Sequence, residues 1–276
     1  MNEQIDQLAA FLDRHRNVLV LTGAGLSTAS GNPGYRDEDG VRRGKPPVQG
    51  PEFRSNDALR RRYWARSMVG WPTLARAEPN AGHHALARLE QAGRVGAVIT
   101  QNVDGLHQRA GSARLIELHG NIHTVRCLAC QRRQQRAALQ QRLLHDNPAL
   151  GSVLAQPLPD GDAQLEPESL EDFVVPECEA CGGVLQPDVV FFGDNIPPER
   201  TRQALDWMDE ADALLVVGSS LMVFSGYRFC KLAAAAGKPI AAVNAGKTRA
   251  DELISLKLAL PAQHVLPAVA ELFSIA

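Results

Sequence analysis

The sequence predicts an α/β protein. Its doubly wound, Rossmann-like parallel sheet should carry a helical insertion and a smaller module that contains four cysteines. Short apolar runs alternate with segments of helical pattern, which is typical of parallel strands joined by crossover helices. Two Cys-x-x-Cys pairs mark a stretch where this alternation stops.

Four apolar runs are the expected strands, at residues 18–21, 95–99, 213–217 and 239–243. Each is short and nearly unbroken, as in strands that are buried on both faces of a sheet. The expected helices between them include residues 83–92 and 199–210. Each run ends in small or polar residues, and ligands of such sheets bind beyond the carboxyl ends of the strands. We therefore expect the functional site at those ends.

Two stretches interrupt the alternation. Residues 40–80 hold a segment rich in proline and arginine and then an aromatic helical run at 60–65. Residues 123–184 hold the cysteine pairs and a loop rich in Pro, Asp and Glu. We expect residues 1–122 and 185–276 to form the Rossmann-like domain, with the helical insert at about 40–80, and residues 123–184 to form the module.

Composition excludes several classes of protein. The 276 residues carry 29 basic and 31 acidic side chains, so the net charge of −2 gives no pull toward nucleic acid or an anionic membrane. The longest uncharged apolar stretch, residues 213–227, is broken by Gly and Ser and is too short to span a bilayer. The acidic, amphipathic first segment does not resemble a signal peptide. We expect a cytoplasmic protein with no membrane or nucleic-acid partner.

A glycine-rich loop, GAGLSTASG at 23–31, directly follows the first strand. Small residues there let backbone N–H groups approach a diphosphate beside a helix N-terminus. The dinucleotide fingerprint G-x-G-x-x-G fails at its third glycine, where Thr28 stands, so a simple tight turn is the alternative. Tyr35 and Arg36 follow nearby, and Arg36 suits either a phosphate clamp or a surface salt bridge.

Polar side chains also follow the second strand. Burying Gln101, Asn102 and Asp104 without partners would be costly, and these side chains suit ribose hydroxyls and a carboxamide. The alternative for Asp104 is to cap a helix. His119 stands beside Gly120 after another apolar run. A neutral imidazole can act as a general base near pH 7, and a structural role is the alternative.

The cysteine pairs are the strongest chemical signal. Cys127, Cys130, Cys178 and Cys181 have the spacing of two knuckles around one tetrahedral zinc ion. Such a closed site leaves no position for a substrate, so zinc should stabilise a module that has little core. Residues 127–181 carry 9 acidic and 4 basic side chains, and this net charge of −5 repels nucleic acid. We expect Cys230 to be a small buried hydrophobe.

Together and in this order, these segments resemble the sirtuin family of NAD-dependent protein deacylases, and the resemblance covers nearly the whole chain. It is carried by GAGLSTASGNPGYR at 23–36, TQNVDGLH at 100–107, LHGN at 118–121, the cysteine pairs, PDVVFFGD at 187–194, GSSLMVFS at 218–225 and VNAG at 243–246. Three features resemble the class II branch of the family, which includes a lipoamidase-type sirtuin. They are RRYWARSMVGWP at 61–72, GSSLMVFSGYRF at 218–229 and the long insert between the cysteine pairs.

The resemblance implies an NAD-dependent protein lysine deacetylase that consumes NAD as a cosubstrate. It transfers the acyl group from lysine to ADP-ribose and releases nicotinamide. The implied catalytic residues are His119, as general base, and Asn102, while Asp104 binds the carboxamide of nicotinamide. An acyl-lysine peptide adds as a strand between residues 193–194 and 223–224. The residues implied to bind NAD are Gly23, Ala24, Gly25, Ser27, Pro33, Tyr35, Arg36, Gln101, Asn102, Asp104, Gly218, Ser219, Ser220, Asn244, Ala245, Gly246 and Ala262.

Two residues depart from the family's pattern, and one residue pair bears on the acyl group. Asn32 stands where the family usually has Ile or Val, beside the implied nicotinamide pocket, and Gly34 loosens the same loop. Tyr63-x-x-Arg66 resembles a pair that some members use to hold dicarboxyl acyl groups. The alternative for that pair is an ordinary helix surface.

Other functions stay open at this point. An NAD(P) dehydrogenase with a zinc module is disfavoured by the missing third glycine and by the absence of an acidic residue after a second strand. An ADP-ribosyltransferase shares the first chemical step, and a lipoamidase-type activity would use the same scaffold. A zinc module that only binds ADP-ribose or a partner would need no base at His119.

Overall fold

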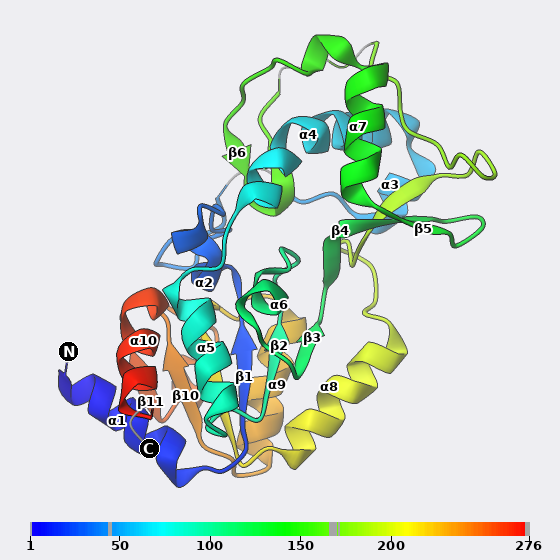
Figure 1. The fold of residues 1–276 in the computed structure, drawn as a ribbon. Helices are drawn as coiled ribbons and strands as arrows, with labels where there is room; N and C mark the ends of the chain where they lie inside the picture. Colours follow the sequence, from blue (N-terminus) through cyan, green and yellow to red (C-terminus); the bar gives the residue numbers. More distant parts are fainter. Residues whose placement is uncertain (1, 44–45, 166–169, 171, 274–276) are drawn as a thin grey trace.

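The computed structural model describes residues 2–43, 46–165, 170 and 172–273. Its centre is a six-stranded sheet in the order β11-β10-β9-β1-β2-β3, in which every neighbouring pair is parallel (Figure 1). The strands are β1 (Val18–Thr22), β2 (Ala97–Thr100), β3 (Leu115–Glu117), β9 (Ala213–Val217), β10 (Ile240–Val243) and β11 (Leu256–Leu258). The predicted doubly wound parallel sheet is confirmed, and β3 and β11 are edge strands that the apolar runs did not predict.

Helices cover both faces of this sheet because its strands are apolar on both faces. In β1, Val18 and Val20 face one helical layer while Leu19 and Leu21 face the other. The first layer consists of α1 (Asn2–Arg14), α5 (Ala81–Gln91) and α10 (Ala262–Leu272). The second layer consists of α8 (Pro198–Glu210) and α9 (Phe224–Ala235), whose Cys230 is fully buried, as predicted.

The strand order creates a switch point between β1 and β9. From β1 the chain moves outward to β2 and β3, and it later returns on the other side of β1 as β9. The loops that follow β1 and β9 therefore start side by side. Ligands of such sheets bind at this position, beyond the carboxyl ends of the strands.

A second, three-stranded antiparallel sheet carries the cysteines. Its order is β5-β4-β8, and with the two Cys-x-x-Cys pairs it forms what we call the cysteine module. The strands are β4 (Gly120–Cys127), β5 (Arg133–Gln135) and β8 (Leu185–Val189). The insert between the pairs is not a bare loop, because it contains α7 (Arg136–Asp146) and the short strands β6 (Pro157–Leu158) and β7 (Asp162–Ala163). Figure 1 shows this module, with α7, in the upper part of the molecule and the large sheet in the lower part.

The cysteine module shares its apolar core with the helical insertion, α3 (Gly50–Ser55) and α4 (Asp57–Arg76). Phe53 and Trp64 from these helices pack in one cluster with Leu139, Leu143 and Leu185. The module's own residues therefore supply only part of its core, because further apolar surface comes from a segment about 80 residues earlier in the chain. Among the helices of the described residues, none is long and apolar enough to cross a membrane.

Candidate active site and metal centre

The predicted cofactor residues gather at the carboxyl edge of the large sheet. The first residues beyond β1, β2, β9 and β10 are Gly23, Gln101, Gly218 and Asn244. These strands are neighbours in the sheet, so segments from four distant parts of the chain meet along one edge.

The loops after β1 and β9 touch through their backbones. The Gly25 amide donates to the Gly218 carbonyl at 2.8 Å, and a Cβ on Gly25 would lie 2.8 Å from that same oxygen. A Cβ on Gly23 would lie 2.8 Å from the Ser219 Cβ. Gly218 itself has a φ of +59°, which side-chain-bearing residues rarely adopt. The glycines here are required by close approach, which supports a built loop rather than an incidental tight turn.

The helix that follows this loop is only one turn long. α2 spans Ala24–Ser27, and a 3₁₀ turn at Thr28–Ser30 continues it. The expected helix N-terminus is therefore too short to supply much of a macrodipole. Any anion bound here must be held mainly by individual N–H groups and by side chains.

Ser27, Asn102 and Asp104 form a hydrogen-bonded cluster beside the loop. The Ser27 hydroxyl donates to Asp104 Oδ2 at 2.7 Å, and Asn102 Nδ2 donates to Ser27 Oγ at 3.0 Å and to the Gly23 carbonyl at 3.1 Å. The other Asp104 oxygen accepts the Leu106 amide at 3.1 Å at the start of α6 (Leu106–Ala110). One Asp104 oxygen therefore holds the first amide of α6, and the other binds Ser27 at the glycine loop.

His119 lies between the second strand's loop and α9. Its Nδ1–H donates to the Gln101 carbonyl at 2.9 Å, which leaves Nε2 as the basic nitrogen, 2.8 Å from the Ser225 hydroxyl. Burial is the main cause that lowers the pKa of His119 from 6.5. The Gln101 side chain also joins the neighbouring loops, because its Nε2 donates to Ser219 Oγ at 2.8 Å. His119 is thus oriented and neutral at pH 7, as a general base must be.

Two buried histidines that the sequence analysis missed, His83 and His107, lie beside Ser27 and Thr22. His107 is 1% exposed, and its Nε2 lies 2.9 Å from the Thr22 hydroxyl, while its Nδ1 has no hydrogen-bond partner among the described residues. The rings of His107 and His83 meet edge to face at 5.0 Å. Burial lowers the pKa of His107 to about 3 and that of His83 to about 4. Both imidazoles are therefore neutral structural groups at pH 7.

His83 was detectable in the sequence through its helix cap. Asn80 begins α5, and its backbone amide donates to His83 Nδ1 in a capping box. The same Asn80 side chain donates to the Leu26 carbonyl at 2.8 Å and to Ser30 Oγ at 2.9 Å. An Asn followed three residues later by His thus ties α5 to the glycine loop.

Four other predicted NAD ligands do not directly follow a strand: Pro33, Tyr35, Arg36 and Ala262. Arg36 donates to the Gly40 carbonyl at 2.9 Å, and the Arg42 guanidinium lies 5.7 Å from the centre of the Tyr35 ring. Pro33 lines a small cavity next to α4, and the buried Ala262 begins α10, which packs against α2.

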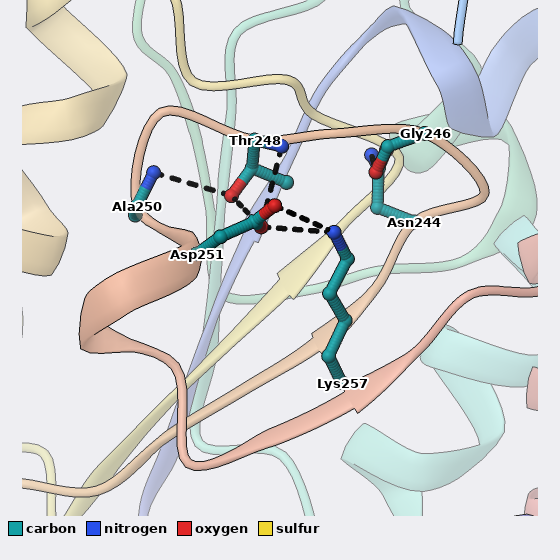
Figure 2. Close-up of polar contacts among 6 residues, drawn as sticks. All are labelled: Asn244, Gly246, Thr248, Ala250, Asp251 and Lys257. Carbon is teal, nitrogen blue, oxygen red and sulfur yellow. Dashed lines mark hydrogen bonds and ion pairs between the residues drawn. The ribbon is translucent and has the colours of Figure 1, made fainter. Parts of the chain in front are cut away.

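The loop after β10 is fixed by a charged network, which Figure 2 shows. Asn244 Nδ2 donates to the Gly246 carbonyl at 2.9 Å. Asp251 Oδ1 accepts from the Thr248 hydroxyl at 2.6 Å, and Lys257 Nζ lies 2.9 Å from both Asp251 oxygens. Burial alone would raise the Asp251 pKa, but the bonds from Thr248 and Lys257 together hold it below its usual value. The carboxylate therefore stays charged and anchors the loop.

The same loop joins its neighbours across the edge of the sheet. The Lys247 amide donates to the Glu38 carbonyl at 2.8 Å, and the Arg249 amide donates to the Ser220 carbonyl at 2.9 Å. A Cβ on Gly246 would lie 2.4 Å from the Glu38 carbonyl oxygen. The loops after β1, β9 and β10 are thus held in one arrangement by backbone contacts.

The Tyr63–Arg66 pair is neither a free anion site nor a plain helix surface. Tyr63 packs in an aromatic cluster with Phe53 and Phe191, and burial raises its pKa. Arg66 is engaged by both oxygens of Asp162 in β7, at 2.7 and 2.6 Å. A dicarboxyl acyl group would have to displace Asp162 to reach this guanidinium.

The segments predicted to hold a peptide are partly exposed. Gly193 has a φ of +81°, and Asp194 is held by two bonds from Arg54 at 2.9 and 2.7 Å. At the start of α9, Val223 is 38% exposed and Phe224 is 57% exposed. Apolar side chains at the start of α9 are therefore available to a ligand.

The four predicted metal ligands converge. Their sulfur atoms all lie within 4.8 Å of one another, with Cys127 Sγ 3.5 Å from Cys181 Sγ and Cys130 Sγ 3.7 Å from Cys178 Sγ. The Cys130 amide, 3.5 Å from Cys127 Sγ, is the main cause that lowers the pKa of that thiol to about 6. Four convergent thiols fit a closed zinc site and could serve together as its ligands.

Comparison with known proteins gives a family and close relatives. The profile of the family described as "Sir2 family" matches residues 23–225. A protein of Xanthomonas campestris pv. campestris (strain 8004) named NAD-dependent protein deacetylase is 53% identical over 251 residues, which are 91% of this chain and 86% of that protein. A protein of the same name from Bordetella bronchiseptica is 51% identical over 265 residues, 96% of this chain and 97% of that protein.

Solved structures agree over almost the full length. A structure described as the basis for the mechanism and regulation of Sir2 enzymes superposes with a TM-score of 0.78 at 34% identity and covers 99% of this chain and 98% of the other. A complex of Sir2 with a p53 peptide and NAD+ gives a TM-score of 0.76 at 29% identity and covers 99% of both chains.

Proposed function

The chain belongs to the Sir2 family and is an NAD-dependent protein deacetylase, and we propose that it removes acyl groups from lysine with His119 as the general base. The observation that carries this proposal is the environment of His119, whose Nδ1 is fixed by a main-chain carbonyl while Nε2 stays basic at the edge of the sheet. The reaction turns acyl-lysine, NAD and one water into lysine, nicotinamide and O-acyl-ADP-ribose. The acyl oxygen attacks C1′ of the nicotinamide ribose as nicotinamide leaves.

The nicotinamide end of NAD is assigned to the residues around Asp104. Asp104 would accept the carboxamide of nicotinamide, and Gln101 and Asn102 would contact the adjoining ribose. The hydrogen bonds among Ser27, Asn102 and Asp104 support this assignment because they orient the amide and carboxylate before any ligand binds.

The base step is assigned to Nε2 of His119. This nitrogen would take a proton by way of the ribose hydroxyls and make an oxygen nucleophilic toward the acyl carbon. Because burial lowers the pKa of His119, the base is unprotonated at neutral pH. The acidic limb of the rate profile should accordingly lie below pH 6.5.

The other half of NAD is assigned to the backbone-packed loops. Gly23, Ala24, Gly25 and Ser27 would meet the diphosphate, with Pro33, Tyr35 and Arg36 beside it. Gly218, Ser219 and Ser220 would hold the adenosine, with Asn244, Ala245, Gly246 and Ala262 around its ribose. The close contact between Gly25 and Gly218 supports this assignment because it holds the two loops side by side at the ends of their strands.

The protein substrate is assigned to the space between residues 193–194 and 223–224. The exposed Val223 and Phe224 support an extended peptide there, bound mainly through its main chain. Pairing of Arg66 with Asp162 supports neutral acyl groups such as acetyl over dicarboxyl ones. Zinc would be held by the four cysteines and would supply fold stability and no chemistry, because four thiolates close its coordination sphere.

Three finer assignments complete the proposal. Four thiols grouped as metal ligands support a reducing compartment, and we place the protein in the cytoplasm. The insert between the cysteine pairs supports the class II branch. The shared core of the cysteine module and α4 supports a small domain that includes more than residues 123–184.

The test is a His119→Ala variant assayed for nicotinamide release and peptide deacetylation. We expect the rate to fall by about 10²- to 10⁴-fold while ADP-ribose binding stays near that of the wild type. His145→Ala is the matched control, because His145 is an exposed histidine whose hydrogen bond goes to the adjacent Asp146. Turnover of the His119→Ala protein close to the wild-type rate would remove His119 from the mechanism.

A further inference from the structure

Asn32 contacts the carboxylate that the proposed function assigns to nicotinamide. Its Nδ2 donates to Asp104 Oδ2 at 3.2 Å. The same oxygen accepts the Ser27 hydroxyl, and the second oxygen accepts the Leu106 amide. Asp104 is 5% exposed, so three donors from the chain itself satisfy a nearly buried carboxylate.

The backbone folds back after the 3₁₀ turn and places Asn32 against the glycine loop. The 3₁₀ turn ends at Gly31, whose φ of +88° reverses the chain, and the Asn32 amide then donates to the Ser27 carbonyl at 3.3 Å. Asn32 is half-buried and lines a small cavity with Pro33, Gly70 and Leu74, among others. Its side chain thus stands between this cavity and Asp104.

The chemistry of the contact is specific. An asparagine side chain ends in a primary carboxamide, and nicotinamide carries the same group on its ring. We propose that Asn32 is an intramolecular competitor for nicotinamide: its carboxamide binds Asp104 when the pocket is empty and must leave before nicotinamide can bind there. This inference rests on the proposed function. It adds that the enzyme resists inhibition by its own product and exchanges bound nicotinamide slowly.

An apolar residue at this position would be compatible with the fold. Without the Asn32 bond, Asp104 keeps the Ser27 and Leu106 donors, so the carboxylate does not become an unpaired buried charge. Asn32→Leu keeps most of the side-chain volume and removes the carboxamide. Asn32→Ala is the second variant, in case the longer side chain disturbs the loop.

The experiment measures nicotinamide inhibition of deacetylation, exchange of labelled nicotinamide, and ADP-ribose binding. We expect Asn32→Leu to lower the nicotinamide inhibition constant by about five- to tenfold, which corresponds to one hydrogen bond. Exchange should become faster. Binding of ADP-ribose should not change, because that ligand lacks the carboxamide.

Asn80→Ala is the matched control. The Asn80 amide also fastens this loop, through Leu26 and Ser30, but it makes no contact with Asp104. A loop that is merely loosened should bind ADP-ribose and nicotinamide less well, whereas loss of a competitor strengthens nicotinamide alone. An unchanged or raised inhibition constant in active Asn32→Leu and Asn32→Ala proteins overturns the inference. If the wild-type protein releases no nicotinamide from NAD and an acetyl-lysine peptide, the proposed function itself fails.

Discussion

The large sheet and the cysteine module are stabilised by different chemistry. The sheet encloses two apolar clusters, one on each face, built from its own strands and helices. The main apolar cluster of the cysteine module includes Phe53, Trp64 and Met68, which come from α3 and α4. One region therefore folds around its own core, while the other needs a neighbouring segment and a metal site.

This difference explains where the reactive groups lie. The sheet supplies rigid strand ends, and the polar residues of the proposed site sit on the loops that begin there. The cysteine module contributes the β4 and β8 strands that follow His119 and precede the peptide segment. Agents that act on thiolates should disturb the cysteine module first, and agents that act on buried histidines should disturb the sheet.

The largest effect is expected from Cys178→Ser. Four-thiolate zinc binding contributes an apparent free energy of about 10–16 kcal/mol, which exceeds the whole stability of many domains. The variant should lose its zinc and the folded structure of the cysteine module, and activity should fall as a consequence. Metal analysis and thermal unfolding of the purified protein measure this.

Cys230→Ala is the control for that prediction. Cys230 is a buried thiol in the apolar core of the sheet, away from the other four, so its loss should cost only about 1 kcal/mol of stability. The contrast between the two regions would be lost if zinc-free wild-type protein were fully folded and active.

An intermediate effect is expected from acid. His107 has a folded pKa of about 3 against an ordinary value of 6.5, so protonation favours the unfolded chain. The stability it contributes is complete above pH 6.5 and is lost as pH falls toward 3, at about 1.4 kcal/mol per pH unit. At pH 5 this amounts to about 2 kcal/mol.

Replacing that histidine isolates its contribution from the protonation of the thiolates. His107→Gln should show a free energy of unfolding that falls less steeply between pH 6.5 and pH 5 than in the wild type, by about 1.4 kcal/mol per pH unit. Denaturant titrations at several pH values measure it. Identical slopes for the two proteins would mean that His107 is not neutral in the folded state.

The smallest effect is expected from Asp251→Asn, which tests the contribution of the loop after β10 to NAD binding. The variant keeps an oxygen for Thr248 but loses the charge that pairs with Lys257. The loop after β10 should loosen, so KM for NAD should rise by about three- to tenfold with little change in kcat. Steady-state kinetics at saturating peptide measure this.

Asp212→Asn is the matched control at the opposite end of the sheet. Asp212 also fixes a loop by accepting the Arg16 and Asn17 amides, but it precedes β9 instead of following a strand. A similar loss of stability without a change in KM is expected. Equal KM changes in both variants would show that Asp251 acts only through overall stability.

The sequence predicted those features whose signal lies within a short stretch of residues. Apolar runs predicted β1, β2, β9 and β10 to within two residues at each end, because strands buried on both faces have few polar side chains. β3 and β11 were missed because each is a three-residue strand at an edge of the sheet. The four thiols were found because their spacing within each pair is itself the signal.

The rest depends on contacts between distant segments. Nothing local shows that Arg66 will meet Asp162, which lies 96 residues later, or that Ser225 will reach His119. The tie from Asp104 to Asn32 is likewise a tertiary contact, although each residue was singled out separately. Residue types and spacings predicted which groups are available, but the fold determined their partners.

The position of β1 between β2 and β9 has a consequence for the newly made chain. On the ribosome, β1 can pair with β2 once Thr100 has emerged, but its other partner ends at Val217, which is 117 residues later. At about 5–20 residues per second this interval lasts roughly 6–23 s. During that time a strand that is apolar on both faces keeps an unpaired edge, which is a template for association with other chains. Expression temperature and chaperone supply should therefore affect the yield of this protein more than its final stability would suggest.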